Sequence, residues 1–229
     1  FILDNLIAEG KAKPMIIVMD NGGGSGLFGQ PRGGRGGAPG NNLVAPNATA
    51  APANAPAAAT AAAPGGPGGG GPGRGPGGRG PGGMSFTEFE NILLKDIIPM
   101  IDSTYRTIGD RKARGMAGLS MGGMQTRNIG LSHLDTFSHI GIFSGGTLGD
   151  PKAENSPLAK VDEFNRLVKV GFISYGEAER GSTTLKEYAD SLRALGIKNV
   201  HTYISPRTAH EFLTWRRSLR EFAPLLFRD

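Results

Sequence analysis

Cysteine is absent from the 229 residues of this sequence. Its absence excludes a disulfide-bonded scaffold and any metal site built from thiolates. Long hydrophobic runs are also missing, since no apolar stretch reaches the roughly 18 residues that a membrane-spanning helix needs. The chain starts at Phe1, with neither an initiator methionine nor the basic and apolar regions of a signal peptide. We therefore expect this start to be a cut within a longer protein.

Acidic residues are missing from one long segment, residues 22–83, although the chain contains 20 of them. The same 62 residues hold 23 of the 38 glycines, 10 of the 16 prolines and four arginines. Taking these four arginines from the 25 lysines and arginines leaves 21 basic residues against 20 acidic ones, so the net charge of +5 becomes +1. The basic balance therefore belongs to the segment and does not indicate an acidic partner for the rest.

Residues 22–83 offer too little apolar surface to form a core, because glycine and alanine dominate and proline blocks sheet ladders. We interpret this segment as a flexible, low-complexity insertion. The flanking residues 1–21 and 84–229 then form one domain of ordinary size. RNA binding by the four arginines is the alternative, but Phe28 is the one aromatic residue among them, so we expect no nucleic-acid partner.

Outside the insertion, short apolar runs alternate with amphipathic segments. The pattern predicts strands over 14–19, 114–119, 138–143, 170–175 and 200–204, and helices over 85–105, 121–134, 158–168, 182–195 and 213–227. Ser85 and Glu88 form a capping box, Pro99 is expected to bend its helix, Ser182 is the predicted cap of another helix, and Gly196 its stop. We therefore predict an α/β fold with a doubly wound, mostly parallel sheet.

Residues 118–122 read Gly-Leu-Ser-Met-Gly and match the G-x-S-x-G motif at a predicted strand-to-helix turn. In that setting the turn strains Ser120 and projects its hydroxyl from the sheet edge as a nucleophile. Small residues at Gly118 and Gly122 let strand and helix approach closely. The alternative is a glycine-rich turn with a capping serine. The backbone amide of Met121 is the expected first oxyanion donor, and Asn21 lies near the same edge as a further substrate contact.

A serine hydroxyl needs a base, and the order nucleophile, acid, base requires a histidine further along the chain. His210 alone follows the last predicted strand, at the carboxyl edge; His133, His139 and His201 lie elsewhere in the predicted elements.

Two glutamates in the loop after the strand predicted over 170–175 are candidates for the acid that holds this histidine. We favour Glu179, with Glu177 as the second candidate. A surface ion pair with Arg180 is the alternative interpretation of both.

Five stretches carry a resemblance to a known family: 2–19, 94–105, 111–123, 129–144 and 208–227. Together they resemble the putative-esterase family of α/β-hydrolases, whose members include feruloyl and acetyl xylan esterases, often attached to xylanases or carbohydrate-binding modules. The resemblance covers nearly everything outside the insertion and implies a sheet of the α/β-hydrolase type. It also implies that this chain lacks the first strands of the fold and the histidine-glycine loop that supplies the family's second oxyanion donor.

The resemblance implies Ser120 as nucleophile and His210 as base, in agreement with their positions. The family's acid is usually an aspartate in the turn after the strand; Glu179 stands at that position, and its longer side chain must fold back to reach the imidazole. Phe212 and Trp215 resemble the aromatic residues that follow the family's histidine. We expect Trp215 to pack in the core and Phe212 to face the acyl pocket and contact substrate.

The expected function is a serine carboxylic ester hydrolase that releases feruloyl or acetyl groups from xylan through an acyl-enzyme on Ser120, without a metal or other cofactor. The resemblance implies a secreted or periplasmic bacterial protein acting on an ester-substituted polysaccharide or a small aryl or acyl ester. It also implies linkage to xylanase or carbohydrate-binding modules; we expect no membrane partner. The alternatives are a degenerate, non-catalytic module that binds carbohydrate, because the aspartate and early strands are missing, and an acyltransferase.

Overall fold

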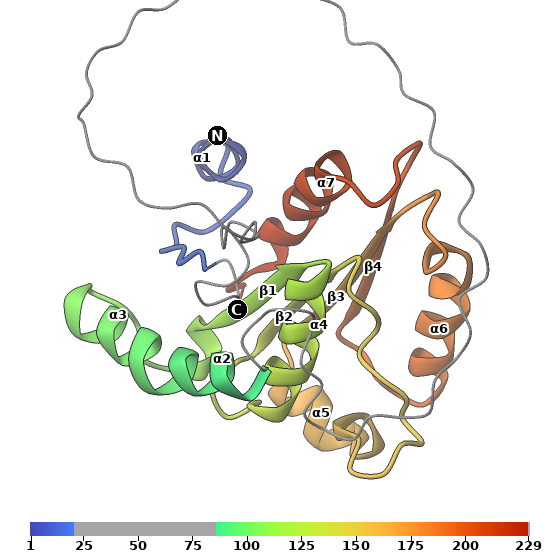
Figure 1. The fold of residues 1–229 in the computed structure, drawn as a ribbon, viewed down its shortest axis with the longest axis horizontal. Helices are drawn as coiled ribbons and strands as arrows, with labels where there is room; N and C mark the ends of the chain where they lie inside the picture. Colours follow the sequence, from blue (N-terminus) through green and yellow to red (C-terminus); the bar gives the residue numbers. More distant parts are fainter. Residues whose placement is uncertain (21–85, 229) are drawn as a thin grey trace, which may run out of the picture.

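The computed structural model describes residues 1–20 and 86–228 (Figure 1). The predicted insertion, Asn21 and the Ser85 half of the predicted capping box lie outside these residues. The described part is an α/β structure whose sheet has four parallel strands in the order of the sequence. They are β1 (Gly115–Leu119), β2 (His139–Phe143), β3 (Val170–Gly176) and β4 (Val200–Ser205). Four of the five predicted strands are therefore confirmed.

The register of the sheet places the carboxyl ends of the strands at one edge. Leu119 pairs with Phe143, Phe143 pairs with Ser174, and Gly176 pairs with Ser205. In a parallel sheet of this kind, the loops that leave this edge carry the functional groups.

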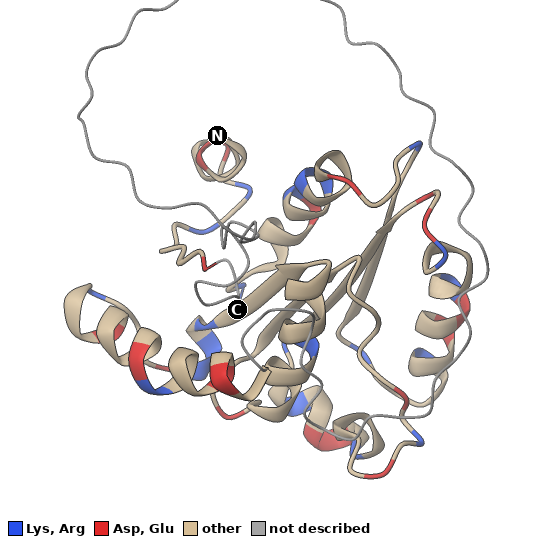
Figure 2. Ribbon diagram, viewed as in Figure 1, with Lys and Arg blue, Asp and Glu red and all other residues tan. Residues whose placement is uncertain are grey.

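Both faces of the two central strands, β2 and β3, are buried, which explains why these strands read as apolar runs. The edge strands of the described sheet, β1 and β4, are partly exposed. Figure 2 shows no Lys, Arg, Asp or Glu in the four strands, as their sequences require. Ile140, Ile142 and Ile173 pack in one buried cluster with residues of α6 (Ser182–Ala194). On the opposite face, Phe143 and Phe172 pack with side chains of α7 (Phe212–Phe222).

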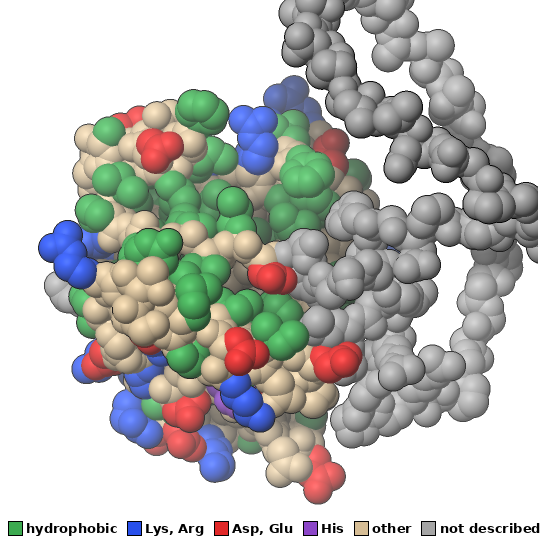
Figure 3. Space-filling view, turned by 60° about the vertical axis from the view of Figure 1, so that its left-hand side comes forward, with side chains coloured by type: hydrophobic (Ala, Val, Ile, Leu, Met, Phe, Trp, Pro, Cys, Tyr) green, Lys and Arg blue, Asp and Glu red, His purple; other side chains and the backbone are tan. Residues whose placement is uncertain are grey.

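The strand predicted over 14–19 is wrong. Residues 14–19 form neither strand nor helix; Ile16 is half-exposed and Met19 is 90% exposed. An apolar run becomes a strand only where a neighbouring strand accepts its backbone hydrogen bonds, and within residues 1–20 and 86–228 β1 pairs with β2 alone. Figure 3 shows many hydrophobic side chains on this side of the molecule.

The helical segments follow the predicted pattern with local differences. The described elements are α1 (Ile2–Ala8), α2 (Phe86–Ile92), η1 (Leu93–Ile97), α3 (Ile98–Thr104), η2 (Arg111–Ala113), α4 (Met121–Gln125), η3 (Thr126–Gly130), η4 (Pro157–Ala159), α5 (Val161–Leu167), α6, α7 and η5 (Ala223–Leu225). A π-helical turn, η1, precedes Pro99, because proline lacks the N–H that an α-helix would use there.

Of the two predicted limits of α6, the stop at Gly196 is confirmed and the cap at Ser182 is wrong. Gly196 lies just beyond its end with a φ of 92°, as a helix stop requires. Ser182 is not the cap: Gly181 precedes the helix, and the Ser182 hydroxyl instead donates to the backbone carbonyls of Glu177 and Glu179. This serine therefore fastens the loop that carries both glutamates. Among the described helices, none has the length and apolarity to cross a membrane.

Candidate active site

Ser120 lies on a strained turn between β1 and α4. Its φ of 53° and ψ of −117° fall in a region that residues with side chains rarely adopt. Its backbone N–H donates to the carbonyl of Phe143 at 2.8 Å, which ties the turn to the end of β2. The strain is the one expected of a G-x-S-x-G elbow, and it exposes the hydroxyl at the carboxyl edge of the sheet.

The glycines around Ser120 have different roles. A Cβ on Gly118 would lie 2.2 Å from the carbonyl oxygen of Gly122, so this position requires glycine. A Cβ on Gly122 would meet nothing within 4 Å. The predicted close approach of strand and helix is thus confirmed between Gly118 and the backbone of Gly122, although Gly122 itself has room for a Cβ. A second close approach falls at Gly123, where a Cβ would lie 2.8 Å from the Cα of Gly145.

The structure brings the three predicted site residues together. The Ser120 Oγ lies 2.8 Å from His210 Nε2, and His210 Nδ1 lies 2.8 Å from Glu179 Oε2. An ionised carboxylate only accepts hydrogen bonds, so Nδ1 carries the ring proton and Nε2 accepts from the serine hydroxyl. The arrangement can therefore take the proton from Ser120 as its oxygen attacks a carbonyl carbon.

Hydrogen bonds stabilise the ionised carboxylate of Glu179. Its side chain is 11% exposed, and its Oε1 accepts hydrogen bonds from the Gly176 N–H and the Ser144 hydroxyl, both at 2.7 Å. Burial opposes ionisation, but the hydrogen bonds from His210, Gly176 and Ser144 outweigh it and hold the pKa of Glu179 below its ordinary value. The bond to Gly176, three residues back, shows that the longer side chain folds back as expected.

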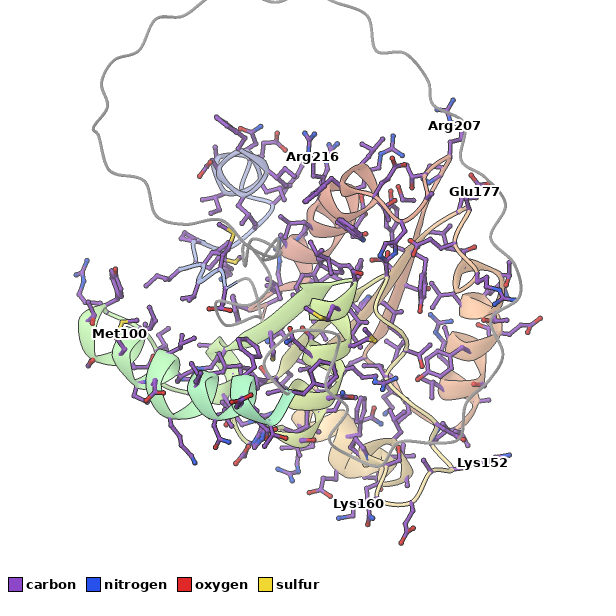
Figure 4. The ribbon with its side chains drawn as sticks, in the orientation of Figure 1. Met100, Lys152, Lys160, Glu177, Arg207 and Arg216 are labelled. Carbon is purple, nitrogen blue, oxygen red and sulfur yellow. The ribbon has the colours of Figure 1, made fainter. Side chains whose placement is uncertain are left out.

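Glu177, the second candidate acid, points elsewhere. Its Oε2 accepts a hydrogen bond from the backbone N–H of Arg207 at 2.6 Å. Figure 4 shows the two residues at neighbouring loop tips beyond β3 and β4. Glu177 therefore joins two loops of the site edge, and Glu179 is the glutamate that contacts His210.

Two of the other histidines, His133 and His139, have partners away from Ser120. His133 Nε2 lies 2.6 Å from Glu90. His139 is buried in β2, where Nε2 accepts the backbone N–H of Phe227 at 3.1 Å and Nδ1 lies 2.8 Å from the Ser138 hydroxyl. Burial, with Arg111 and Lys169 nearby, lowers the pKa of His139 to about 4, which keeps it neutral at physiological pH. Both roles are structural.

Aromatic side chains line one side of the imidazole. The ring of Trp215 packs edge to face against His210, with centroids 5.1 Å apart, and Phe212 packs against Trp215 at 5.2 Å. Phe212 begins α7 and is 73% exposed, so most of its ring is available for contact. Trp215 also donates from Nε1 to the Ser144 hydroxyl at 3.0 Å, a polar contact that the sequence interpretation missed.

Met121 is the first residue of α4, so its backbone N–H has no acceptor within the helix. This N–H remains the predicted oxyanion donor beside Ser120. Asn21 lies outside the described residues. No group of three or more His, Asp or Glu residues in the described ranges is arranged to hold a metal ion.

The family model described as "Putative esterase" matches residues 73–221, which is more than half of the chain. The endo-1,4-beta-xylanase/feruloyl esterase of Xylanibacter ruminicola is 40% identical over 146 residues, covering 62% of this chain and 18% of that protein. This chain therefore spans about a fifth of the length of that curated relative.

Solved structures also resemble the chain. A structure of FAE is 20% identical, covers 64% of this chain and 61% of that one, and gives a TM-score of 0.50. A mutant of the feruloyl esterase module from Clostridium thermocellum, complexed with sinapinate, has the same identity and coverage and a TM-score of 0.49. The chain spans about three fifths of each of these structures. With the parallel sheet, the likeness to FAE confirms the predicted fold, which is of the α/β-hydrolase type.

Proposed function

This chain belongs to the putative-esterase family, and from that membership we propose that it hydrolyses carboxylic esters by way of an acyl-enzyme on Ser120. The observation that carries the proposal is the unbroken hydrogen-bond chain from Glu179 through His210 to the strained Ser120. These three groups come from loops after three different strands, and their distances match those of a nucleophile, a base and an orienting acid.

Acylation starts when Ser120 Oγ attacks the ester carbonyl carbon and His210 Nε2 takes the hydroxyl proton. The carbonyl oxygen becomes negatively charged in the tetrahedral intermediate, and in this proposal the Met121 N–H donates a hydrogen bond to it. The intermediate then collapses, the carbon–oxygen bond to the alcohol breaks, and His210 returns the proton to the departing alcohol. The acyl group is left on Ser120 as an ester.

Deacylation repeats the sequence with water in place of the serine. His210 takes a proton from a water molecule as its oxygen attacks the acyl carbon, and then returns this proton to Ser120 Oγ as the acid leaves. Glu179 holds the ring tautomer and stabilises the positive imidazolium in both halves of the reaction. Because both halves use the same base, loss of its orientation slows both.

For the substrate, we propose feruloyl or acetyl esters on xylan, handled outside the cell. The relative from Xylanibacter ruminicola, named as a xylanase and feruloyl esterase, supports this choice. The exposed ring of Phe212, beside the wall formed by Trp215 and His210, supports an aromatic acyl group such as feruloyl over acetyl. Linkage to a xylanase module would fit the fraction of that relative that the chain spans.

A fluorophosphonate probe tests the nucleophile. It is expected to label the wild-type protein and to leave Ser120→Ala unlabelled, while methyl ferulate and p-nitrophenyl acetate are hydrolysed by the wild type alone. Labelling of both proteins would overturn the assignment of Ser120. A folded protein that neither reacts with the probe nor hydrolyses either ester would support a non-catalytic carbohydrate-binding module. Ester formation on added xylo-oligosaccharide would indicate acyl transfer.

A further inference from the structure

A hydrogen-bond chain continues beyond Glu179 from Oε1, the carboxylate oxygen that does not contact His210. The Trp215 Nε1 lies 3.0 Å from the Ser144 hydroxyl oxygen, which in turn lies 2.7 Å from Glu179 Oε1. These three residues come from α7, from the end of β2 and from the loop after β3. The nucleophile, the base and the acid are therefore three members of a longer chain of five hydrogen-bonded side chains.

The chemistry of the two ends fixes the direction of these bonds. An indole N–H only donates, so the Ser144 oxygen accepts from Trp215. An ionised carboxylate only accepts, so the single hydroxyl proton of Ser144 points to Oε1 of Glu179. A hydroxyl that has already accepted a hydrogen bond is a stronger donor, which reinforces the bond to the carboxylate. Both protons along this chain thus point toward the acid.

The backbone at Ser144 supports a role for its hydroxyl. Ser144 has a φ of 53°, in the left-handed region that favours glycine, and its N–H donates to the Ser174 carbonyl at 2.8 Å. Strain alone does not single it out, since Asn155 and Arg207 also have positive φ values. What distinguishes Ser144 from these two is that its side chain contacts the acid of the site.

A glutamate needs such support more than an aspartate does. Its carboxylate ends a longer chain with one more rotatable bond, so more orientations compete with the one that meets His210. Two donors on Oε1, the Gly176 N–H and the Ser144 hydroxyl, leave Oε2 as the oxygen that faces Nδ1. Trp215 adds a second restraint, because its ring edge also packs against the imidazole.

We propose that Ser144 and Trp215 are positioning residues of the ester-hydrolysing site, which hold Glu179 and His210 in register with Ser120. The inference rests on the proposed function. Neither residue touches the reacting atoms: Ser144 acts through the carboxylate, and Trp215 acts through Ser144 and the face of the imidazole.

Ser144→Gly separates positioning from structural support. Glycine accepts the positive φ without strain, which offsets part of the loss of the two hydrogen bonds of the hydroxyl, so thermal stability is expected to change little. The hydroxyl is lost, so kcat on methyl ferulate is expected to fall about tenfold, with KM within about twofold. Asn155→Gly is the matched control: it relieves a similar φ of 61° and is expected to leave kcat unchanged.

Trp215→Phe keeps a ring against His210 but removes the indole N–H. Its kcat is expected to fall about threefold. Because Trp215 acts on the acid through Ser144, the double variant with Ser144→Gly is expected to lose no more than Ser144→Gly alone. In proton NMR, the downfield resonance of His210 Nδ1–H is expected to shift or broaden in Ser144→Gly and to stay in place in Asn155→Gly.

The outcomes distinguish the two proposals. If the wild type hydrolyses the ester and Ser144→Gly retains its kcat and the His210 resonance, the positioning role is overturned while the esterase proposal stands. Losses that simply multiply in the double variant would also contradict it, because they would show two independent effects. If the wild type shows neither turnover nor fluorophosphonate labelling, the esterase proposal itself fails.

Discussion

Glu177 and Glu179 are two residues apart in one loop, yet their side chains serve different purposes. Glu177 accepts the backbone N–H of Arg207, whereas Glu179 folds back onto the Gly176 N–H and meets His210. In the sequence, either carboxylate was a candidate to hold the imidazole. What separates them is the direction in which each leaves the tight turn after β3.

Replacing each glutamate by glutamine tests this difference. Glu179→Gln removes the negative charge and presents an amide to Nδ1, so the imidazole loses its preferred tautomer; kcat is expected to fall at least about a hundredfold. Glu177→Gln keeps an oxygen that can accept the N–H of Arg207, so its kcat is expected to stay within about twofold of wild type. Similar losses in the two variants would place the acid elsewhere.

The sequence was sufficient for residues whose chemistry has a motif or a fixed place in chain order. Ser120 follows from its pentapeptide, and His210 from its place after the last strand. Ser144 and Trp215 were not predictable as partners, because 71 residues separate them and no short pattern marks the contact. The one available signal was that Ser144 follows a strand at the same sheet edge as Ser120, which does not reveal where its hydroxyl points.

The elbow between β1 and α4 depends on backbone proximity at two specific glycines. Gly118 and Gly123 each approach another backbone segment closely. Gly122 also belongs to the motif, but a Cβ at this position would meet no atom within 4 Å. The pentapeptide therefore identifies the turn without identifying all the positions at which the turn excludes a side chain.

Alanine at neighbouring positions of α4 is expected to have opposite effects. Gly123→Ala places a Cβ against the backbone of Gly145 and is expected to lower the free energy of unfolding by about 1–3 kcal/mol. Gly122→Ala meets no atom within 4 Å and is expected to raise it by about 0.5–1 kcal/mol, since alanine restricts the unfolded chain. Urea unfolding measures both; a larger loss in Gly122→Ala would contradict the structure.

β2 and β3 were predictable because each is an uncharged, mostly apolar run that is buried on both faces. β1 and β4 are also uncharged but partly exposed, at the edges of the described sheet. The run over 14–19 has the same composition but no neighbouring strand among the described residues, so it stays exposed. An apolar composition shows that a segment can form a strand. Backbone hydrogen bonds to a neighbouring strand decide whether it does. The π-helical turns at η1 and η3 were likewise beyond a pattern based on the ordinary helical repeat.

The C-terminal end of the described chain packs on one buried histidine. His139 Nε2 accepts the N–H of Phe227, whose ring packs edge to face on the imidazole, and Arg228 donates to the carbonyl of Lys11. Figure 1 shows the C-terminus close to β1 and β2. A neutral His139 therefore holds the last residues of the chain against the centre of the sheet.

Protonation of His139 is expected to weaken the whole fold. The pKa is lowered to about 4 in the folded protein, so the unfolded chain binds this proton first, and stability falls as the pH drops from about 6.5 toward 4. Above pH 6.5 the stability contributed by neutral His139 is fully present. The loss is on the order of 3 kcal/mol over the full window, measured as the free energy of unfolding in urea at each pH.

His139→Gln is expected to have a lower free energy of unfolding than the wild type at pH 7.5. Between pH 6.5 and 5, before carboxylates titrate, its free energy of unfolding is expected to fall less than that of the wild type. His201, whose pKa burial also lowers, adds a smaller loss of the same sign, so His201→Gln serves as the comparison. An unchanged slope in His139→Gln would assign the pH dependence to other groups.

Each of the four strands delivers one member of the site at its carboxyl end: Ser120 after β1, Ser144 after β2, Glu179 after β3 and His210 after β4. No pair of adjacent strands is enough to assemble the working arrangement. The proposed catalysis therefore requires that all four strands are paired. During refolding, enzymatic activity should return only with the last strand to dock, later than helix formation as followed by far-ultraviolet circular dichroism.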